Sequence, residues 1–372
     1  MWKIWKEELY KMASRKIIWI GLLLLLAFLG LRTNSERRYY SVTINGTTYF
    51  GQEAIEKDQA LTAQYAGILT IDKMQNIYNT YGFYYHDDIK DQDIGNFCNR
   101  FITEHMTTAR QTGWESFDDI QFLQGEEWDA YAAPLLNGTV YFDYVYGWND
   151  LKEIHSILTV MALFILFIIG ISPVFSEEYA LKTAPLLLAT QKGKQSGIWL
   201  KMTAALFFPV VLYAAVTLYI WFLYFIVYGT QGLDASPALI GMPLNGYCPP
   251  DIRSFFLFAF GLNLAGLLLL TCMTLAVSAL CRNAFLALIL SLALFLLPYA
   301  CLNYGIVLLS SFLNASLIKA LFHFFASMPF YLSMSWGFAF SSAQIAQHLC
   351  IALAVAAACT ICGYHAYRNY PG

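Results

Sequence analysis

The sequence predicts a polytopic α-helical membrane protein with six transmembrane helices, an N-terminal interfacial helix and an α+β extracytoplasmic domain inserted after the first span. Composition is the first reason, because 58% of the 372 residues are hydrophobic and only 13% are charged, against about 45–50% and about 25% in soluble proteins. The second reason is that the charges are clustered, so that long stretches of the chain contain none. The third is a charged segment, residues 32–153, that is long enough to form a small core. These features exclude an ordinary soluble enzyme and a disordered or collagen-like chain.

Residues 1–16 predict a helix that lies on the membrane surface. Trp2, Trp5, Leu9 and Met12 follow one another at spacings of three, four and three residues, which places them on one helical face. The lysines of this segment fall elsewhere on the helix. An apolar face with flanking lysines is typical of an interfacial helix in contact with lipid.

Uncharged stretches locate the membrane spans, because a bilayer core of about 30 Å needs about 20 apolar residues in a helix. The first span covers 17–31, with a basic flank at Arg15 and Lys16 that can extend towards the membrane surface. Residues 154–372 form a five-span domain. The six spans are expected near residues 14–31, 155–175, 202–228, 255–280, 285–309 and 345–366.

The segment 32–153 differs from the rest of the chain in charge, with 9 basic and 19 acidic residues. Val42 to Tyr49 surrounds an Asn-Gly pair and predicts a β-hairpin, and residues 136–142 repeat the Asn-Gly pattern. Helices are expected over 52–65, over 91–110, and after Thr70, which can cap a helix that carries Ile71, Met74, Ile77 and Tyr78 on one face. Trp114, Trp128 and Trp148 are candidate core residues of an α+β domain.

Lysine and arginine set the expected orientation, since cytoplasmic loops carry an excess of both. Six spans place the two termini on the same side, and that side holds most of the basic residues outside the segment 32–153. The opposite short loops hold only Arg253 and Lys319, although Arg32, Arg37 and Arg38 count against the assignment. Both termini are therefore expected in the cytoplasm, with 32–153 outside.

The sequence lacks the motifs of the common catalytic and cofactor sites. There is no G-x-x-x-x-G-K-[ST] motif for ATP and no H-E-x-x-H motif for zinc. The pairs His86-Asp87 and Glu104-His105 lack further ligands at metal-binding spacing and are interpreted as solvated surface. No cofactor, metal or nucleic-acid partner is expected, and the chain is not expected to be an enzyme.

The interiors of the expected spans contain no Asp, Glu, Lys or Arg. Ion-coupled carriers usually need such groups. Asn263 and Asn303 are the main polar side chains at depth, and we interpret both as bonding between helices. Transport powered within this chain is disfavoured, so any transport would draw its energy from a partner.

The loop of residues 176–201 is the largest cytoplasmic connection that the sequence predicts. It begins with Glu177 and Glu178, continues through the apolar run 186–188, and contains four lysines. A charged helix with one apolar ridge suits docking into a groove on a soluble protein. The alternative is a solvated loop between two helices.

At this loop the chain resembles the permease subunits of ABC type-2 exporters, in the bacterial branch with a large extracytoplasmic domain between the first and second spans. In that family the loop commonly has an F-x-x-E motif, then G-T, then L-L, and ends in basic residues. Lys182 stands where glycine is usual. The residues that carry the resemblance are Phe175, Glu178, Thr183, Leu186, Leu187, Lys192, Lys194 and Lys201.

The resemblance implies a permease subunit of an ATP-driven exporter in a bacterial cell membrane. Its partners would be a separately encoded ABC ATPase subunit, a second permease copy or a paralogue, and membrane lipid. It also implies a re-entrant segment over 310–342, for which a plain outer loop is the alternative. The expected coupling and ATPase-docking residues are Glu177, Glu178, Lys182, Thr183, Leu186, Leu187, Lys192 and Lys194.

A membrane-anchored sensor or receptor, with an extracytoplasmic domain that binds a ligand, is the alternative function. The sequence leaves the transported substrate open, together with the choice between homodimer and heterodimer. It also leaves open the role of the extracytoplasmic domain and a disulfide between Cys98 and Cys248.

Overall fold

The computed structural model describes residues 1–84, 95–110, 120–129, 132–133, 138, 140–190, 193–243, 246–305 and 314–370. The chain divides into two compact units. The span unit consists of Met1–Ala27, His155–Leu218 and Ala259–Gly372, and the inserted unit consists of Phe28–Ile154 and Tyr219–Phe258.

The described residues contain six helices that are long and apolar enough to cross a membrane, which confirms the predicted number. All six lie where the uncharged stretches predicted them. The first continues to Tyr39 instead of ending at Leu31, because arginine and glutamate sustain a helix well after the apolar stretch has ended. The six cover Lys16–Tyr39, Val160–Ala180, Gly193–Tyr228, Ile252–Leu280, Ala284–Gly305 and Ser342–Arg368.

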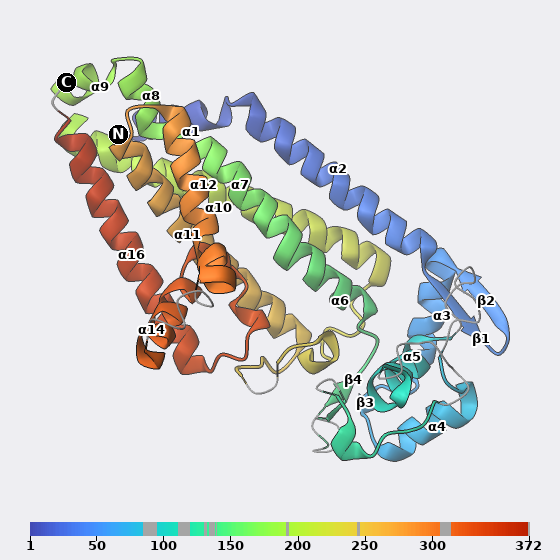
Figure 1. Cartoon of the computed structure of the whole chain (residues 1–372). Helices are drawn as coiled ribbons and strands as arrows, with labels where there is room; N and C mark the ends of the chain where they lie inside the picture. The colour runs from blue at the N-terminus through green and yellow to red at the C-terminus, as the bar shows by residue number, and fades with distance from the viewer. Residues whose placement is uncertain are drawn as a thin grey trace. The chain divides into compact units, whose positions relative to one another are not determined.

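Figure 1 shows these elements as long helices. Helix α1 (Trp2–Ala13) precedes α2 (Lys16–Tyr39), and α6 (Tyr146–Glu153) leads through a π-helical segment, Ile154–Thr159, into α7 (Val160–Ile171). The remaining long helices are α10 (Ile198–Tyr228), α11 (Ile252–Leu280), α12 (Ala284–Ala300) and α16 (Ser342–Arg368).

Between α12 and α16 the described residues include the α-helices α14 (Ala315–Ala326) and α15 (Pro329–Ser333). Helix α14 has 12 residues, which is too few to cross a bilayer. The chain turns at Ser327 and Met328, and Pro329 begins α15. The described part of 310–342 is therefore largely helical, while residues 306–313 lie outside the described residues.

Aromatic and small residues pack the span unit. The ring of Phe164 on α7 meets that of Phe295 on α12 with centroids 5.7 Å apart. A Cβ added to Gly363 of α16 would lie 3.2 Å from the Cα of Ala276 on α11, so the two helices approach closely there. Such small-residue contacts are a common way to pack helices in membranes. Asn303 donates to the hydroxyl oxygen of Tyr331 at 2.8 Å, which is the interhelical bond expected for it.

The inserted unit contains the predicted hairpin. Strand β1 (Ser41–Ile44) pairs antiparallel with β2 (Thr47–Phe50), so that Ile44 faces Thr47 across the turn. Asn45 and Gly46 both have positive φ, 51° and 77°. This geometry matches a type I′ turn, for which Asn-Gly is a preferred pair.

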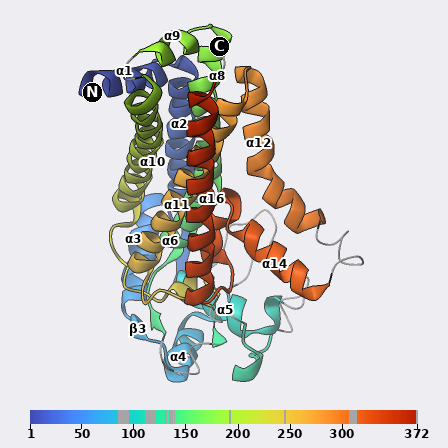
Figure 2. The ribbon, with the colours of Figure 1, turned by 90° about the vertical axis from the view of Figure 1, so that its left-hand side faces the viewer.

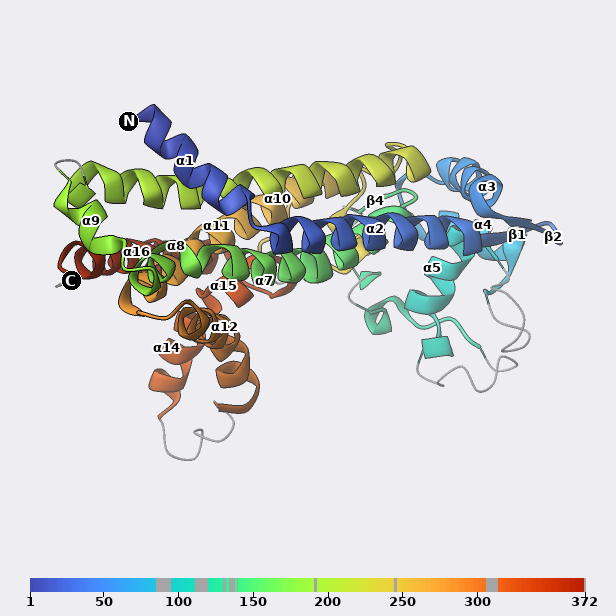
Figure 3. The same cartoon turned by 90° about the horizontal axis from the view of Figure 1, so that it is seen from above.

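After the hairpin, the described part of the inserted unit continues with the helices α3 (Gly51–Ala63), α4 (Ile71–Tyr81) and α5 (Phe97–Met106), which Figure 3 labels. Thr70 caps α4 as predicted, because its hydroxyl accepts from the amide of Lys73. Met74 and Ile77 are buried, whereas the side chain of Ile71 is 54% exposed. The predicted face of α4 is therefore buried at Met74 and Ile77 and exposed at its first residue, Ile71.

Residues 67–68 (β3) and 141–142 (β4) form a second short antiparallel pair. The predicted second hairpin falls partly outside the described residues, and its described strand pairs with β3 across a long separation in sequence. Trp148 is buried and Trp128 is half-buried, while Trp114 lies outside the described residues.

A buried carboxyl group ties two helices of the inserted unit together. Asp58 on α3 is 1% exposed and accepts from the backbone amide of Phe97, the first residue of α5, and from the Tyr40 hydroxyl at 2.5 Å. Burial raises the pKa of Asp58 to about 6, although the two donors favour the charged form. This carboxyl group therefore titrates far closer to neutral pH than an exposed aspartate.

Candidate functional site: the α8–α9 loop and its support

The predicted coupling loop forms two short helices joined by a tight turn. Helix α8 (Pro173–Ala180) continues from α7, and α9 (Ala184–Ala189) begins after Thr183, whose amide donates to the Glu178 carbonyl at 2.9 Å. Lys182 lies in the turn with a φ of 55°. Glycine adopts this left-handed conformation most easily, which gives a physical reason why a family with this turn would favour glycine there.

Helix α9 separates its apolar residues into a buried and an exposed set. Ala184 and Leu188 are buried and anchor the helix. Leu186 is 71% exposed and Leu187 is 39% exposed, and Leu181 in the preceding turn is 66% exposed. We call Leu181, Leu186 and Leu187 the leucine surface of the loop.

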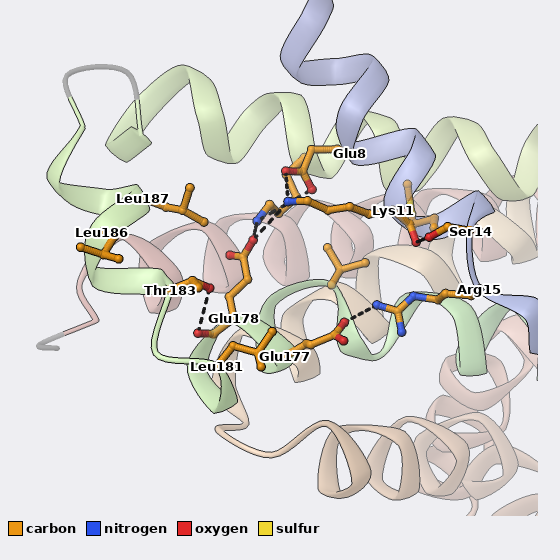
Figure 4. A pocket seen from close by; sticks show the side chains of 13 residues that line it. Glu8, Lys11, Ser14, Arg15, Glu177, Glu178, Leu181, Thr183, Leu186 and Leu187 are labelled. Atoms are coloured by element: carbon orange, nitrogen blue, oxygen red, sulfur yellow. Dashed lines mark hydrogen bonds and ion pairs between the residues drawn. The ribbon is translucent and has the colours of Figure 1, made fainter.

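The carboxylate of Glu178 lies beneath this turn and is 8% exposed. It accepts from the ammonium group of Lys201 at the start of the third span and from the hydroxyl of Tyr367 near the end of α16. The Lys11 ammonium lies 3.8 Å from the same carboxylate. Lys201 is 5% exposed and also lies over the ring of Phe175, 5.5 Å from its centroid. One buried carboxylate therefore connects the loop to α1, α10 and α16. Figure 4 shows Glu178 beside Lys11 of α1.

The neighbouring Glu177 makes a different contact. Its carboxylate accepts from the guanidinium of Arg15 at 2.5 Å, and 48% of the Glu177 side chain is exposed. Figure 4 shows this pair at the edge of a pocket of about 610 Å³. The leucine surface lines the same pocket together with Thr183, Glu8, Lys11 and Met12.

The structure brings together most of the predicted coupling residues. Glu177, Glu178, Thr183, Leu186 and Leu187 all line the pocket. Lys182 is exposed in the turn, the Lys194 carbonyl accepts from the Tyr364 hydroxyl at 3.3 Å, and Lys192 lies outside the described residues.

Sequence reasoning missed two members of this network, Lys11 and Tyr367. Tyr367 follows Glu178 by 189 residues, and no local pattern marks its hydroxyl as a partner. Lys11 was treated as a solvated residue of the N-terminal helix, yet it lies against the loop. A signal for Lys11 exists in hindsight, because it lies one position from Met12 on the turn of helix that faces the first span.

The interfacial helix is formed by α1, but its predicted face is only partly buried. Trp2 and Trp5 stack with centroids 5.0 Å apart, and Trp5 also contacts the ring of Phe207 on α10. Trp2 is 64% exposed, Leu9 is half-buried and Met12 is buried. The face thus packs on the protein at its C-terminal end and leaves its first tryptophan uncovered.

Arg282 and several aromatic rings contact one another at the same end of the span unit. Arg282, in the turn before α12, lies over the ring of Tyr370, and the Tyr370 ring contacts Tyr179 of α8. The ring of Trp199 stacks on Tyr364 of α16. Figure 2 shows α1, α9 and the C-terminal end of α16 at this end.

The site combines an exposed apolar surface with a buried ionic contact. Among the described residues, no group of three or more His, Cys, Asp or Glu side chains is placed to hold a metal ion. The ionic contacts of Glu177 and Glu178 join elements of this chain, while Leu181, Leu186 and Leu187 stay 39–71% exposed among the described residues. Comparison with known proteins finds no matching family model, and no characterised protein or solved structure with detectable similarity to the chain.

Proposed function

We propose that this chain is the membrane-spanning permease subunit of an ATP-driven exporter, and that the α8–α9 loop couples it to a separate ATPase subunit. The observation that carries the proposal is the pairing of an exposed leucine surface with a buried ionic support directly beneath it. The likeness of this loop to that of ABC type-2 permeases supports the same assignment.

The leucine surface supplies the docking free energy. Burying two leucine side chains contributes about 3–6 kcal/mol before the cost of association. Leu186 and Leu187 lie on a helix that is anchored by Ala184 and Leu188, so little ordering is needed when a partner covers them. A groove on a soluble subunit that accepts one short helix would fit this surface.

The Glu178 network transmits the motion of the docked subunit. A push on α9 reaches α8 through the short turn, α10 through Lys201 and α16 through Tyr367. A buried charge pair keeps its geometry because separation would leave both charges unpaired in a poorly hydrated place. The loop and the ends of three spans would therefore move together.

The energy for transport would come from outside the chain. The sequence has no Asp, Glu, Lys or Arg between Lys201 and Asp234 or between Arg253 and Arg282, which covers most of the third and fourth candidate spans. Without charged groups at depth, an ion gradient has little to act on. ATP hydrolysis by a partner subunit, coupled through the loop, would supply the energy for transport.

The translocation pathway would form between two such subunits, a second copy or a paralogue. Only 22% of the most apolar window of the first span and 17% of that of the last span is buried within the chain. These helices therefore leave apolar surface for lipid and for a second subunit.

The substitution Leu187→Asp tests the proposal. The full chain would be expressed with the ATPase whose gene adjoins its own, and co-purification and stimulated ATP hydrolysis would be measured in nanodiscs. We expect the substitution to abolish both, since a carboxylate in place of a docked leucine forfeits most of the apolar contribution. Ile71→Asp is a matched control, because Ile71 is an exposed aliphatic residue of the inserted unit.

Unchanged co-purification and unchanged ATP hydrolysis by the Leu187→Asp variant would contradict the coupling role. A neighbouring gene for a kinase, and co-purification of that kinase in place of an ATPase, would favour the membrane-anchored sensor.

A further inference from the structure

A groove of about 650 Å³ lies between α14 and α16 in the span unit, apart from the α8–α9 loop. Its polar lining consists of Ser316, Lys319, His323, Gln344 and Gln347. Each of these side chains can donate a hydrogen bond, and none is a carboxylate. Figures 1 and 2 both show α14 beside α16.

The charge of this region is positive and has no counterpart nearby in sequence. No Asp or Glu follows Asp251 in the chain, so neither α14, α16 nor the residues that join them can supply an anion. Lys319 is exposed and forms no ion pair within the described part of the chain. An uncompensated lysine surrounded by hydrogen-bond donors favours an anionic ligand.

Two histidines that contact each other, His323 and His348, lie at the groove, and His323 lines it. Nδ1 of His323 lies 3.0 Å from Nε2 of His348, which is fully buried. Nδ1 of His348 is also buried and has no hydrogen-bond partner among the described residues. We assign the His348 proton to Nε2, because a buried N–H group without an acceptor is the rarer arrangement.

This assignment determines the role of His323. If His348 donates from Nε2, then Nδ1 of His323 is the acceptor, and the proton of a neutral His323 ring is on its Nε2. That nitrogen makes no hydrogen bond within the described residues. His323 thus offers an unused N–H donor from a residue that lines the groove.

The remaining lining is apolar. Ala320, Phe324 and Ile351 border the polar residues, and Phe324 is 43% exposed. Because α16 is a candidate span, acyl chains are the natural cover for such a surface.

We propose that the α14–α16 groove binds the phosphate headgroup of an anionic phospholipid. Lys319 pairs with the phosphate, His323 and the two glutamines donate to its oxygens, and Phe324 and Ile351 contact the upper part of the acyl chains. The proposal is independent of the coupling role of the α8–α9 loop, because the two sites share no residue.

Native mass spectrometry of the full chain in a neutral detergent tests the site. Phosphatidylglycerol would be titrated against phosphatidylcholine, and the fraction of chain that carries one lipid would be measured. We expect retention of phosphatidylglycerol to exceed that of phosphatidylcholine. Lys319→Gln should weaken phosphatidylglycerol binding about fivefold, since one lysine near an anionic headgroup contributes about that factor.

Three further variants test whether the binding of phosphatidylglycerol is specific to the groove. Lys319→Arg retains the charge and should bind as the unmodified chain does, and Lys57→Gln removes a lysine of the inserted unit and should change nothing. Gln347→Leu, at an exposed position, should weaken binding without a loss of fold.

Equal binding of phosphatidylglycerol by the unmodified chain and by Lys319→Gln would overturn the proposal. Inorganic phosphate and glycerol 3-phosphate should fail to displace the lipid at millimolar concentration. If either displaces it as readily as free phosphatidylglycerol does, the site recognises phosphate alone and the lipid assignment is wrong.

Discussion

Glu178 of the α8–α9 loop and Asp58 of the inserted unit are both buried carboxyl groups, and they are held in opposite ways. Glu178 is surrounded by cations, Lys201 and Lys11, with one hydroxyl donor from Tyr367. Asp58 receives its hydrogen bonds from neutral groups, the Tyr40 hydroxyl and the Phe97 amide. Removing the charge of Glu178 takes away the closest anion of Lys201, whereas the charged form of Asp58 is penalised by burial more than its two donors favour it.

The substitution Glu178→Gln tests the role of the Glu178 carboxylate and should have the largest effect on stability of the variants proposed. Glutamine can still accept from Tyr367, but Lys201 then keeps only the more distant carboxylate of Glu8, at 3.9 Å, as an anionic partner among the described residues. Loss of one partner from a buried pair typically costs about 3–5 kcal/mol. We expect a large fall in the thermal stability of the purified chain and loss of stimulated ATP hydrolysis.

The double substitution Glu178→Gln with Lys201→Met tests whether the loss of stability comes from the ammonium group of Lys201. Removing both charges should restore most of the lost stability, because the cost lies in the unpaired ammonium group and not in the missing contact. A double variant no more stable than Glu178→Gln alone would show that the ion pair is not the support of the loop.

The second half of the comparison concerns pH. The pKa of Asp58 is raised by burial to about 6 from its ordinary value of 3.8, so the folded unit prefers the neutral acid. The resulting stabilisation is complete below pH 3.8 and is lost as the pH rises through about 6. The inserted unit should therefore be more stable at pH 5 than at pH 7.5 by about 1.4 kcal/mol, roughly half of the full contribution of about 3 kcal/mol.

Hydrogen exchange in the full chain measures this effect. Amides of α3 and α5, corrected for intrinsic exchange rates, should be better protected at pH 5 than at pH 7.5. Asp58→Asn should remove the Asp58 contribution to this pH dependence. Protection with the same pH dependence in both proteins would contradict the assignment of Asp58.

Glu177→Gln should have the smallest effect. Its partner Arg15 and the glutamate itself are partly exposed, and such pairs contribute about 0–1 kcal/mol. The variant should keep its thermal stability and its ATPase complex within error, while 0.5 M salt should reproduce whatever small change it shows. A loss as large as that of Glu178→Gln would mean that the docking of α1, and not the buried network, supports the loop.

The features that the sequence could predict depend on residues that lie close together in the chain. The spans follow from uncharged length, the hairpin from Asn45-Gly46 and the start of α4 from Thr70, and all of these signals are local in the chain. The structure confirms each of them. Ile71 lies on the helical face that the periodicity predicts and is still exposed, because periodicity does not show whether a neighbour covers that turn.

The support of the loop could not be predicted in the same way. Glu178 meets Lys201 after 23 residues and Tyr367 after 189, and only the packing of α8, α10 and α16 brings the three together. Lys182 departs from a family pattern in sequence, while its φ of 55° shows that the backbone shape favoured by glycine is kept. Leu186 and Leu187 were predicted from the apolar run 186–188, whereas the burial of Leu188 and the exposure of Leu181 emerged only from the structure.

Site-specific photocrosslinking at Leu186 tests the central claim most directly. A photoreactive phenylalanine analogue would replace Leu186 in the full chain, in cells that also express the neighbouring ATPase, with Ile71 as the control position. We predict a crosslinked product of the chain and the ATPase at position 186 and none at position 71. The absence of an ATPase product at 186, with the chain correctly inserted and abundant, would contradict the assignment of the α8–α9 loop as the coupling element.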